Sequence, residues 1–203
     1  MKKISILSIL VLFVSISHVQ AQIQKKDILL GGTLSIGTNN FSGGNSTSNT
    51  NLNPRIGYAL GNNSVLNLRL GFGINNGKSS YSSNKYTSFS AGVSWKRFFS
   101  VKEKFGWYTD LYGNASIGNS RQTVPPSSSS KSTSTGFGAG LNPGIYYTPL
   151  PRLIVSADFG GIAYSYTKST ATGIDTFHSS YVNVNFLNYF SFGVDFILTK
   201  RKS

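Results

Sequence analysis

The sequence predicts an all-β protein, an eight-stranded antiparallel up-and-down transmembrane β-barrel. Three observations predict this fold. Eight segments after residue 27 alternate apolar and polar side chains with a period of two, which is the pattern of a β-strand. Long and short polar connections alternate strictly between these segments. The apolar face of the segments carries a single charged residue, and the length of 203 residues suits one small barrel.

Residues 1–21 have the features of a cleaved secretory signal peptide. A positively charged start at Lys2 and Lys3 is followed by a mostly apolar stretch over residues 4–16 and a small-residue cleavage site ending at Ala21. The apolar stretch is shorter than the ~20 residues that a membrane-spanning helix needs. We therefore expect the mature chain to leave the cytoplasm without a helical membrane anchor.

The remaining chain, residues 22–203, is expected to form one barrel domain. Its strands are expected within about residues 28–198, followed by a short basic tail at the C-terminus. The apolar faces of the eight segments are, in chain order, Leu30, Leu34 and Ile36; Leu52, Ile56, Tyr58 and Leu60; Leu66, Leu68, Leu70, Phe72 and Ile74; Phe89, Ala91, Val93, Trp95 and Phe99; Trp107, Thr109, Leu111, Ala115 and Ile117; Phe137, Ala139, Leu141, Ile145 and Tyr147; Leu153, Val155, Ala157 and Phe159; and Val182, Val184, Phe186, Phe190, Phe192, Val194, Phe196 and Leu198.

The connections between the segments differ in length. The long ones are rich in Ser, Asn, Thr and Gly and are expected to be loops over residues 39–51, 75–85, 119–134 and 167–180. The short ones are expected to be turns over residues 61–64, 100–104 and 148–152. Strict alternation of this kind is typical of a membrane barrel with one exposed rim and one periplasmic rim.

Composition narrows the function classes. The chain has 22 Gly, 11 Tyr, 14 Phe and no Cys, which favours strands and excludes disulfides and Cys-ligated metals. We expect no metal and no cofactor, because the acids are dispersed and the mature chain has one histidine. The net charge of +13 comes from scattered Lys and Arg with only six acids, so we do not expect nucleic-acid binding.

The charge pattern indicates which face of the barrel meets lipid. Arg97 is the one charge on the apolar face and lies close to a strand end. A Lys or Arg costs roughly 2–4 kcal/mol at the middle of a bilayer and about 0–1 kcal/mol near its surface. Buried charges need partners, and an eight-stranded barrel is filled by its side chains. The opposite face therefore predicts an interior ionic network formed by Arg55, Arg69, Lys96, Asp110, Asp158 and Asp195.

The last segment adds a more specific signal. Residues 191–198, with Gly193, Phe196 and Leu198, resemble the signal read by the barrel-assembly machinery, although the chain continues for five residues beyond it. Together with the strand pattern, this resembles the small bacterial outer-membrane β-barrel family, the OmpA- and OmpX-type barrels. The resemblance implies insertion by that machinery, contact with outer-membrane lipid, loops facing outside and both termini in the periplasm.

The function predicted is non-enzymatic: an integral outer-membrane barrel with a structural or surface-interaction role through its exposed loops, whose ligand the sequence does not identify. Three alternatives stay open at this point. His178, with Asp175, Ser179 and Ser180 nearby, suggests a lipid-modifying enzyme, but a catalytic triad requires groups that converge in space. The inward charges suggest a narrow channel. A soluble periplasmic lipocalin-like barrel would show the same alternation with its faces exchanged.

Overall fold

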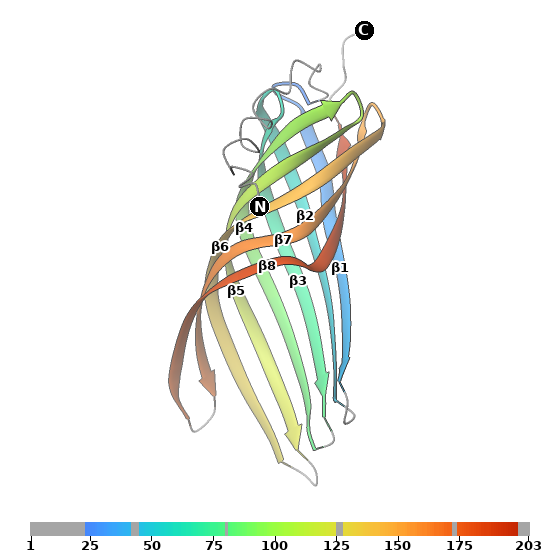
Figure 1. Ribbon diagram of the computed structural model, residues 1–203. Coiled ribbons are helices and arrows are strands. Elements are labelled where there is room, and N and C mark those ends of the chain that lie inside the picture. The colour runs from blue at the N-terminus through green and yellow to red at the C-terminus, as the bar shows by residue number, and fades with distance from the viewer. Residues whose placement is uncertain (1–22, 42–44, 80, 125–127, 172–173, 199–203) are drawn as a thin grey trace, which may run out of the picture.

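The structure is a computed structural model that describes residues 23–41, 45–79, 81–124, 128–171 and 174–198. It contains eight antiparallel strands in one closed sheet, each paired with its neighbours in sequence (Figure 1). The strands are β1 (Ile28–Phe41), β2 (Asn45–Gly61), β3 (Ser64–Lys78), β4 (Ser83–Lys102), β5 (Phe105–Val124), β6 (Ser128–Leu150), β7 (Leu153–Ala171) and β8 (Ile174–Ile197). The expected signal peptide at 1–21 and most of the basic tail lie outside the described residues.

The described part of the chain holds no helix that is both long and apolar enough to span a membrane. Where their side chains are described, the predicted apolar residues lie on the outside of the barrel; the side chain of Phe190 lies outside the described part. Leu68, Val93 and Leu111, for example, are 56%, 55% and 51% exposed. The alternate positions, such as Ser94 and Lys96, are buried inside. The predicted direction of the faces is therefore confirmed, and the lipocalin-like alternative, which needs the reverse, is wrong.

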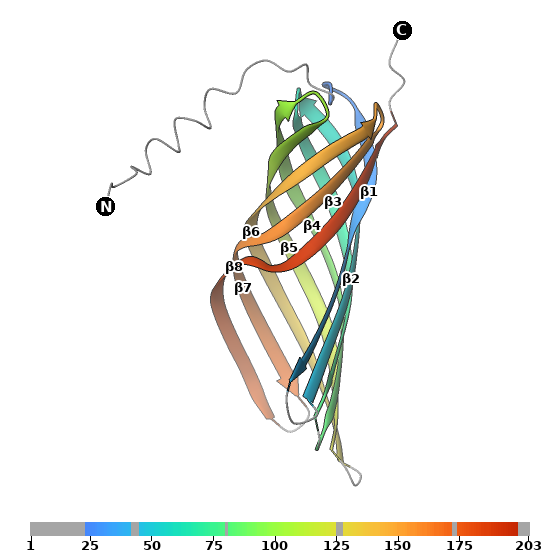
Figure 2. The ribbon, with the colours of Figure 1, turned by 45° about the vertical axis from the view of Figure 1, so that its right-hand side comes forward.

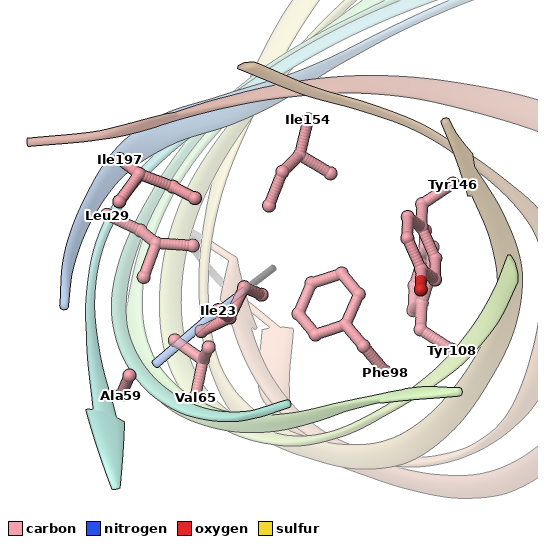
Figure 3. Close-up of a cluster of buried hydrophobic side chains, with 9 residues drawn as sticks. All are labelled: Ile23, Leu29, Ala59, Val65, Phe98, Tyr108, Tyr146, Ile154 and Ile197. Atoms are coloured by element: carbon pink, nitrogen blue, oxygen red, sulfur yellow. The ribbon is translucent and has the colours of Figure 1, made fainter. Parts of the chain in front are cut away.

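The barrel is filled at the end that carries the short turns. Figure 3 shows side chains from strands all around the wall converging there, together with Ile23, which precedes β1. Phe98 packs edge-on against Tyr146, with ring centroids 5.1 Å apart. The peptide N–H of Asn63 donates to the carbonyl of Ile23 at 3.2 Å, which fastens the incoming chain across this end. The apolar cluster consists of Ile23, Leu29, Ala59, Val65, Phe98, Tyr108, Tyr146, Ile154 and Ile197.

The predicted long loops are mostly strand, which corrects the expectation from composition. Pairing of β5 with β6 continues to Val124 and Ser128, well inside the predicted loop 119–134. Polar side chains connect these extensions across strands: Thr133 donates to Asn119 at 3.2 Å and Ser120 to Asn84 at 2.8 Å. Once a hairpin register is set, each further pair adds backbone hydrogen bonds, and Ser, Thr and Asn side chains do not prevent it.

The seam between β1 and β8 closes the barrel over part of its height. Leu29–Leu34 of β1 pair with Phe192–Ile197 of β8, in six residue pairs. Along β7, Asp158 faces Ser191 whereas Gly160, with a φ of 89°, faces Phe186, so β8 contains extra residues at this point. Figure 2 shows the first half of β8 bending away from β1 beyond it.

Candidate functional site

An ion pair inside the barrel joins β2 to β8. Arg55 donates from Nε to Oδ1 of Asp195 at 2.7 Å and from Nη2 to Oδ2 at 2.6 Å. Both side chains are almost fully buried, at 3% and 4% exposure. A bidentate guanidinium–carboxylate pair is among the strongest hydrogen-bonded arrangements in proteins, and it fixes the geometry of both groups.

Gly31 allows this pair to form, because it lies on β1 between the two partners. It faces Arg55 on one side and Asp195 on the other. A Cβ atom at position 31 would collide with the Asp195 carboxylate and the carbonyl of Val194. The space that a side chain would fill is therefore occupied by the ion pair itself.

A second ion pair crosses from β3 to β5. Arg69 Nη1 is 3.3 Å from Oδ2 of Asp110, and its guanidinium lies 5.4 Å from the centre of the Tyr112 ring. Arg69 on β3 is also directly opposite Arg55 on the neighbouring strand β2. Because each arginine has its own carboxylate, the two like charges are neutralised side by side. Arg69 is 22% exposed and lies where the filled region ends, on the side of the long hairpins.

Lys96 and Asp158 are connected through a residue that sequence reasoning missed. The Nζ of Lys96 is 4.2 Å from the centre of the Tyr108 ring, within the range of a cation–π contact. The Tyr108 hydroxyl donates a hydrogen bond to Asp158. Lys96 also lies opposite Asp110 in the β4–β5 register. An aromatic side chain at an inward position of the predicted strand, two residues before Asp110, is the signal that could have identified Tyr108.

The six predicted interior residues are thus all inside the barrel. Four of them form two ion pairs, and Tyr108 connects the other two. We call this set with Tyr108 the interior plug: Arg55, Arg69, Lys96, Tyr108, Asp110, Asp158 and Asp195. One oxygen of the plug, Oδ1 of Asp110, is buried without a hydrogen-bond partner among the described residues.

The three residues of the predicted assembly signal lie on different faces of β8. Gly193 is buried inside, where a Cβ would come within 3.2 Å of the Arg55 guanidinium. Phe196 and Leu198 face outward and are 52% and 54% exposed. A Cβ there would also come within 2.6 Å of the Ser156 hydroxyl and 3.0 Å of Thr33, so close packing inside the barrel accounts for the glycine.

A polar cavity of about 420 Å³ lies on the hairpin side of the plug. Arg69, Tyr112 and Asn114 contribute to its wall, as does Tyr181 on the part of β8 that bends away from β1. The other lining residues are Asn53, Leu70, Tyr86, Ser90, Gly92, Gly113, Ser116, Phe137, Gly138, Asn142, Ser165, Tyr166 and Thr167. The interior is consequently filled at the short-turn end and hollow toward the long hairpins.

His178 lies outside the barrel, on the hairpin between β7 and β8. Its Nδ1 is 2.7 Å from the hydroxyl of Tyr166, and its strand partner is Lys168. The side chain of Asp175 lies outside the described residues. Within the described residues the contact of His178 is to a phenol rather than to the serine and carboxylate that a triad requires. No group of three or more potential metal-ligating side chains occurs among them.

Comparison with solved structures finds proteins of similar fold. The translocator domain of the autotransporter NalP from Neisseria meningitidis aligns with a TM-score of 0.55 at 12% identity, covering 77% of this chain and 58% of that domain. This chain therefore spans little more than half the length of that relative, and the likeness concerns the fold alone. A search among curated proteins found no match.

Two smaller barrels were also found. Neisserial surface protein A has a TM-score of 0.44 at 18% identity, with 85% of this chain and 97% of that one covered. Ail, the attachment invasion locus protein of Yersinia pestis, has a TM-score of 0.39 at 17% identity, with 86% and 99% covered. The sequence pattern of the outer membrane protein beta-barrel domain matches residues 6–187, which is most of the chain. The chain belongs to the outer membrane protein beta-barrel family.

Proposed function

We propose that this outer-membrane barrel is non-enzymatic and presents four long β-hairpins at the cell surface, where they serve a structural or surface-interaction role. The observation that carries the proposal is the length of the strands beyond the apolar band. Strands of 14 to 24 residues are all longer than the ~9–11 residues that a tilted strand needs to cross a bilayer.

The apolar band ends at a defined level on each strand. On β5 the last outward apolar residue before the polar extension is Ile117, and the next outward positions are Asn119 and Arg121. The paired β5–β6 hairpin continues to Val124 and Ser128, about 20 Å farther along the strands. Apart from Val124 at its end, both faces of this extension are polar, as expected of a sheet in water. The corresponding last apolar residues on the other strands are Ile36, Leu52, Ile74, Phe89, Phe137, Tyr164 and Val182.

The proposed orientation puts these hairpins outside and the short turns and both ends of the barrel in the periplasm. Outer-membrane barrels have short periplasmic turns and longer extracellular connections. β1 begins and β8 ends at the short-turn rim, where the N–H of Leu198 donates to the carbonyl of Ile28 at 2.8 Å. Insertion by the barrel-assembly machinery and contact with outer-membrane lipid are part of the same proposal.

The channel and enzyme alternatives have less support. Arg55, Lys96, Phe98 and Tyr108 are all buried and fill the short-turn end of the lumen, so a continuous aqueous path is not expected. His178 is hydrogen-bonded to the Tyr166 hydroxyl on the outer surface, not to the serine and carboxylate that a triad requires. The filled lumen and the extended hairpins together favour display at the surface over transport or catalysis.

The absence of cysteine makes the proposed orientation directly testable. Ser129→Cys places one thiol on the β5–β6 hairpin, and Asn62→Cys places one in the short β2–β3 turn. Whole cells are treated with a membrane-impermeant maleimide. We expect labelling of the first variant and not the second until the outer membrane is permeabilised. The opposite pattern would overturn the orientation.

Two further measurements address the alternatives. Purified protein in a planar bilayer is expected to be electrically silent, and discrete conductance steps would replace the proposal with a channel. Cells that express the chain and cells that express His178→Ala are expected to have lipid A of the same mass as cells without it. A mass change that depends on His178 would establish the enzyme instead.

A further inference from the structure

Five basic side chains lie on the outward surface just beyond the apolar band. They occupy outward, exposed positions on five adjacent strands, β3 to β7, on the hairpin side of the barrel. These residues are Lys78, Lys85, Arg121, Lys131 and Lys168. In the sequence, residues 75–89 and 117–137, which carry four of them, contain no Asp or Glu. These four basic residues therefore have no acidic residue in the sequence segments around them.

Three of the five are aligned by the strand register. Lys85 on β4 is directly opposite Arg121 on β5, and Arg121 is directly opposite Lys131 on β6. Directly opposite residues on one face have Cβ atoms about 4.5–5.5 Å apart, and like charges in such positions repel. A row of three cations on adjacent strands is therefore unfavourable unless something anionic lies against it. We call these three residues the basic row.

The depth of the basic row corresponds to the lipid headgroups. The row formed by Phe89, Ile117 and their β6 neighbour Thr135 is at the edge of the apolar band. The basic row follows four residues farther along β4 and β5, about 13 Å along strands that are tilted by ~35–45°. This puts the charges roughly 10 Å above the hydrocarbon, and Lys and Arg side chains can reach back toward it. The three side chains lie at outward, exposed positions, above the hydrocarbon and at the level expected for the headgroups.

We propose that the basic row binds the phosphate groups of an outer-leaflet glycolipid. Phosphate fits this surface because arginine binds it through two parallel hydrogen bonds and lysines beside it add point charges. A phosphate held among the three cations would also remove their mutual repulsion. The inference rests on the proposed function, since only outward-facing hairpins put this row in the outer leaflet.

The test uses a charge-matched pair of triple variants. The first is Lys85→Gln, Arg121→Gln and Lys131→Gln. The control removes two lysines and one arginine from exposed positions at the short-turn rim: Lys102→Gln, Lys104→Gln and Arg152→Gln. Each folded protein, in zwitterionic detergent micelles, is titrated with bisphosphorylated lipid A and with the same lipid after removal of both phosphates. Faster migration of the unboiled band on an SDS gel establishes that each variant is folded.

The wild type and the control are expected to bind the phosphorylated lipid, with affinity that falls as salt is added. The basic-row variant is expected to bind it about 100-fold more weakly, from roughly 1 kcal/mol for each removed charge. Equal affinity of the two variants, or equal binding of the dephosphorylated lipid, would overturn the proposal. Displacement of the lipid by millimolar inorganic phosphate would show a free-anion site and would overturn the lipid assignment.

The micelle experiment does not depend on orientation in the cell, which separates the two proposals. If the cysteine labelling places the hairpins outside but the basic-row variant binds as the wild type does, the glycolipid inference alone fails. If the hairpins are in the periplasm while phosphorylated lipid binds through the row in micelles, the proposed orientation fails, and with it the assignment to the outer leaflet.

Discussion

Arg55 and Asp195 are separated by 140 positions in the sequence but form a bidentate ion pair inside the barrel, with Nη2 and Oδ2 2.6 Å apart. The pair connects the second strand to the last, across β1. It therefore stabilises the seam where the two ends of the sheet meet. The seam has six residue pairs, and the ion pair adds a direct link from β2 to β8 behind it.

Replacing Gly31 is predicted to weaken this seam. In Gly31→Ala the added methyl group meets the Asp195 carboxylate and the Val194 carbonyl, and the backbone carbonyl cannot move without disturbing the strand. We expect a loss of roughly 1–3 kcal/mol of stability, as for other overpacked sites. The measurement is the temperature at which the fast-migrating band disappears from SDS gels. Gly77→Ala is the control, because its nearest neighbours would be 3.8 and 3.9 Å away. Equal midpoints for the two variants would contradict the prediction.

Asp195→Asn tests the ion pair itself. The substitution leaves the Arg55 guanidinium buried without a carboxylate, which costs about 3–5 kcal/mol in comparable pairs. Urea unfolding in detergent micelles, followed by tryptophan fluorescence, measures the loss. The double variant Arg55→Leu with Asp195→Leu removes both charges and is expected to recover much of the lost stability. A single variant as stable as the wild type would show that water or another group compensates the arginine.

Tyr108→Phe separates two roles of one side chain. The ring under Lys96 is retained, whereas the hydroxyl that donates to Asp158 is lost. Leaving the partly buried Asp158 without its donor is expected to cost about 1 kcal/mol. Tyr147→Phe on the lipid-facing surface, where the side chain is 48% exposed, is the control and should unfold at the same urea concentration as the wild type. Unfolding of Tyr108→Phe and Tyr147→Phe at the same urea concentration would contradict the prediction.

The sequence predicted the strands and their faces because lipid imposes a strict rule on them. Every second residue between Leu66 and Ile74 must be apolar, and this alternation is visible without a structure. The hairpin extensions were missed for the same reason. Beyond Ile117 both faces of the strand meet water, so alternation disappears and Ser-, Thr- and Asn-rich segments have the composition of loops.

The interior residue types were also predictable, but their pairing was not. That Arg55 bonds to Asp195 and Arg69 to Asp110 depends on the strand register, which a single sequence does not specify. The basic row was not apparent for a related reason. Lys85, Arg121 and Lys131 are scattered in the sequence and become neighbours only through the cross-strand register.

The independence of the membrane part from the hairpins can be tested by shortening one hairpin. Gly118 and Ser134 face each other, so residues 119–133 can be replaced by Asn-Gly, a preferred two-residue hairpin turn. The apolar band and the plug are untouched, and we expect the variant to insert and to keep the fast-migrating unboiled band. Loss of that band would mean that the extension is needed for folding. The same deletion applied four residues deeper, into the apolar band, is expected to prevent insertion.

Insertion by the barrel-assembly machinery predicts a difference between two phenylalanines on the same strand. Phe192 and Phe196 both face outward on β8, are 63% and 52% exposed, and lie opposite Leu34 and Leu30 of β1. Replacing either phenylalanine with serine removes a similar amount of lipid-facing apolar surface. If lipid contact alone mattered, the two variants would assemble equally slowly. If Phe196 is read as part of an assembly signal, Phe196→Ser should accumulate unfolded in pulse-chase experiments well beyond Phe192→Ser. Both purified variants should then refold into detergent micelles at similar rates, because no machinery is present there. Equal assembly rates in cells would instead reduce the role of Phe196 to lipid contact.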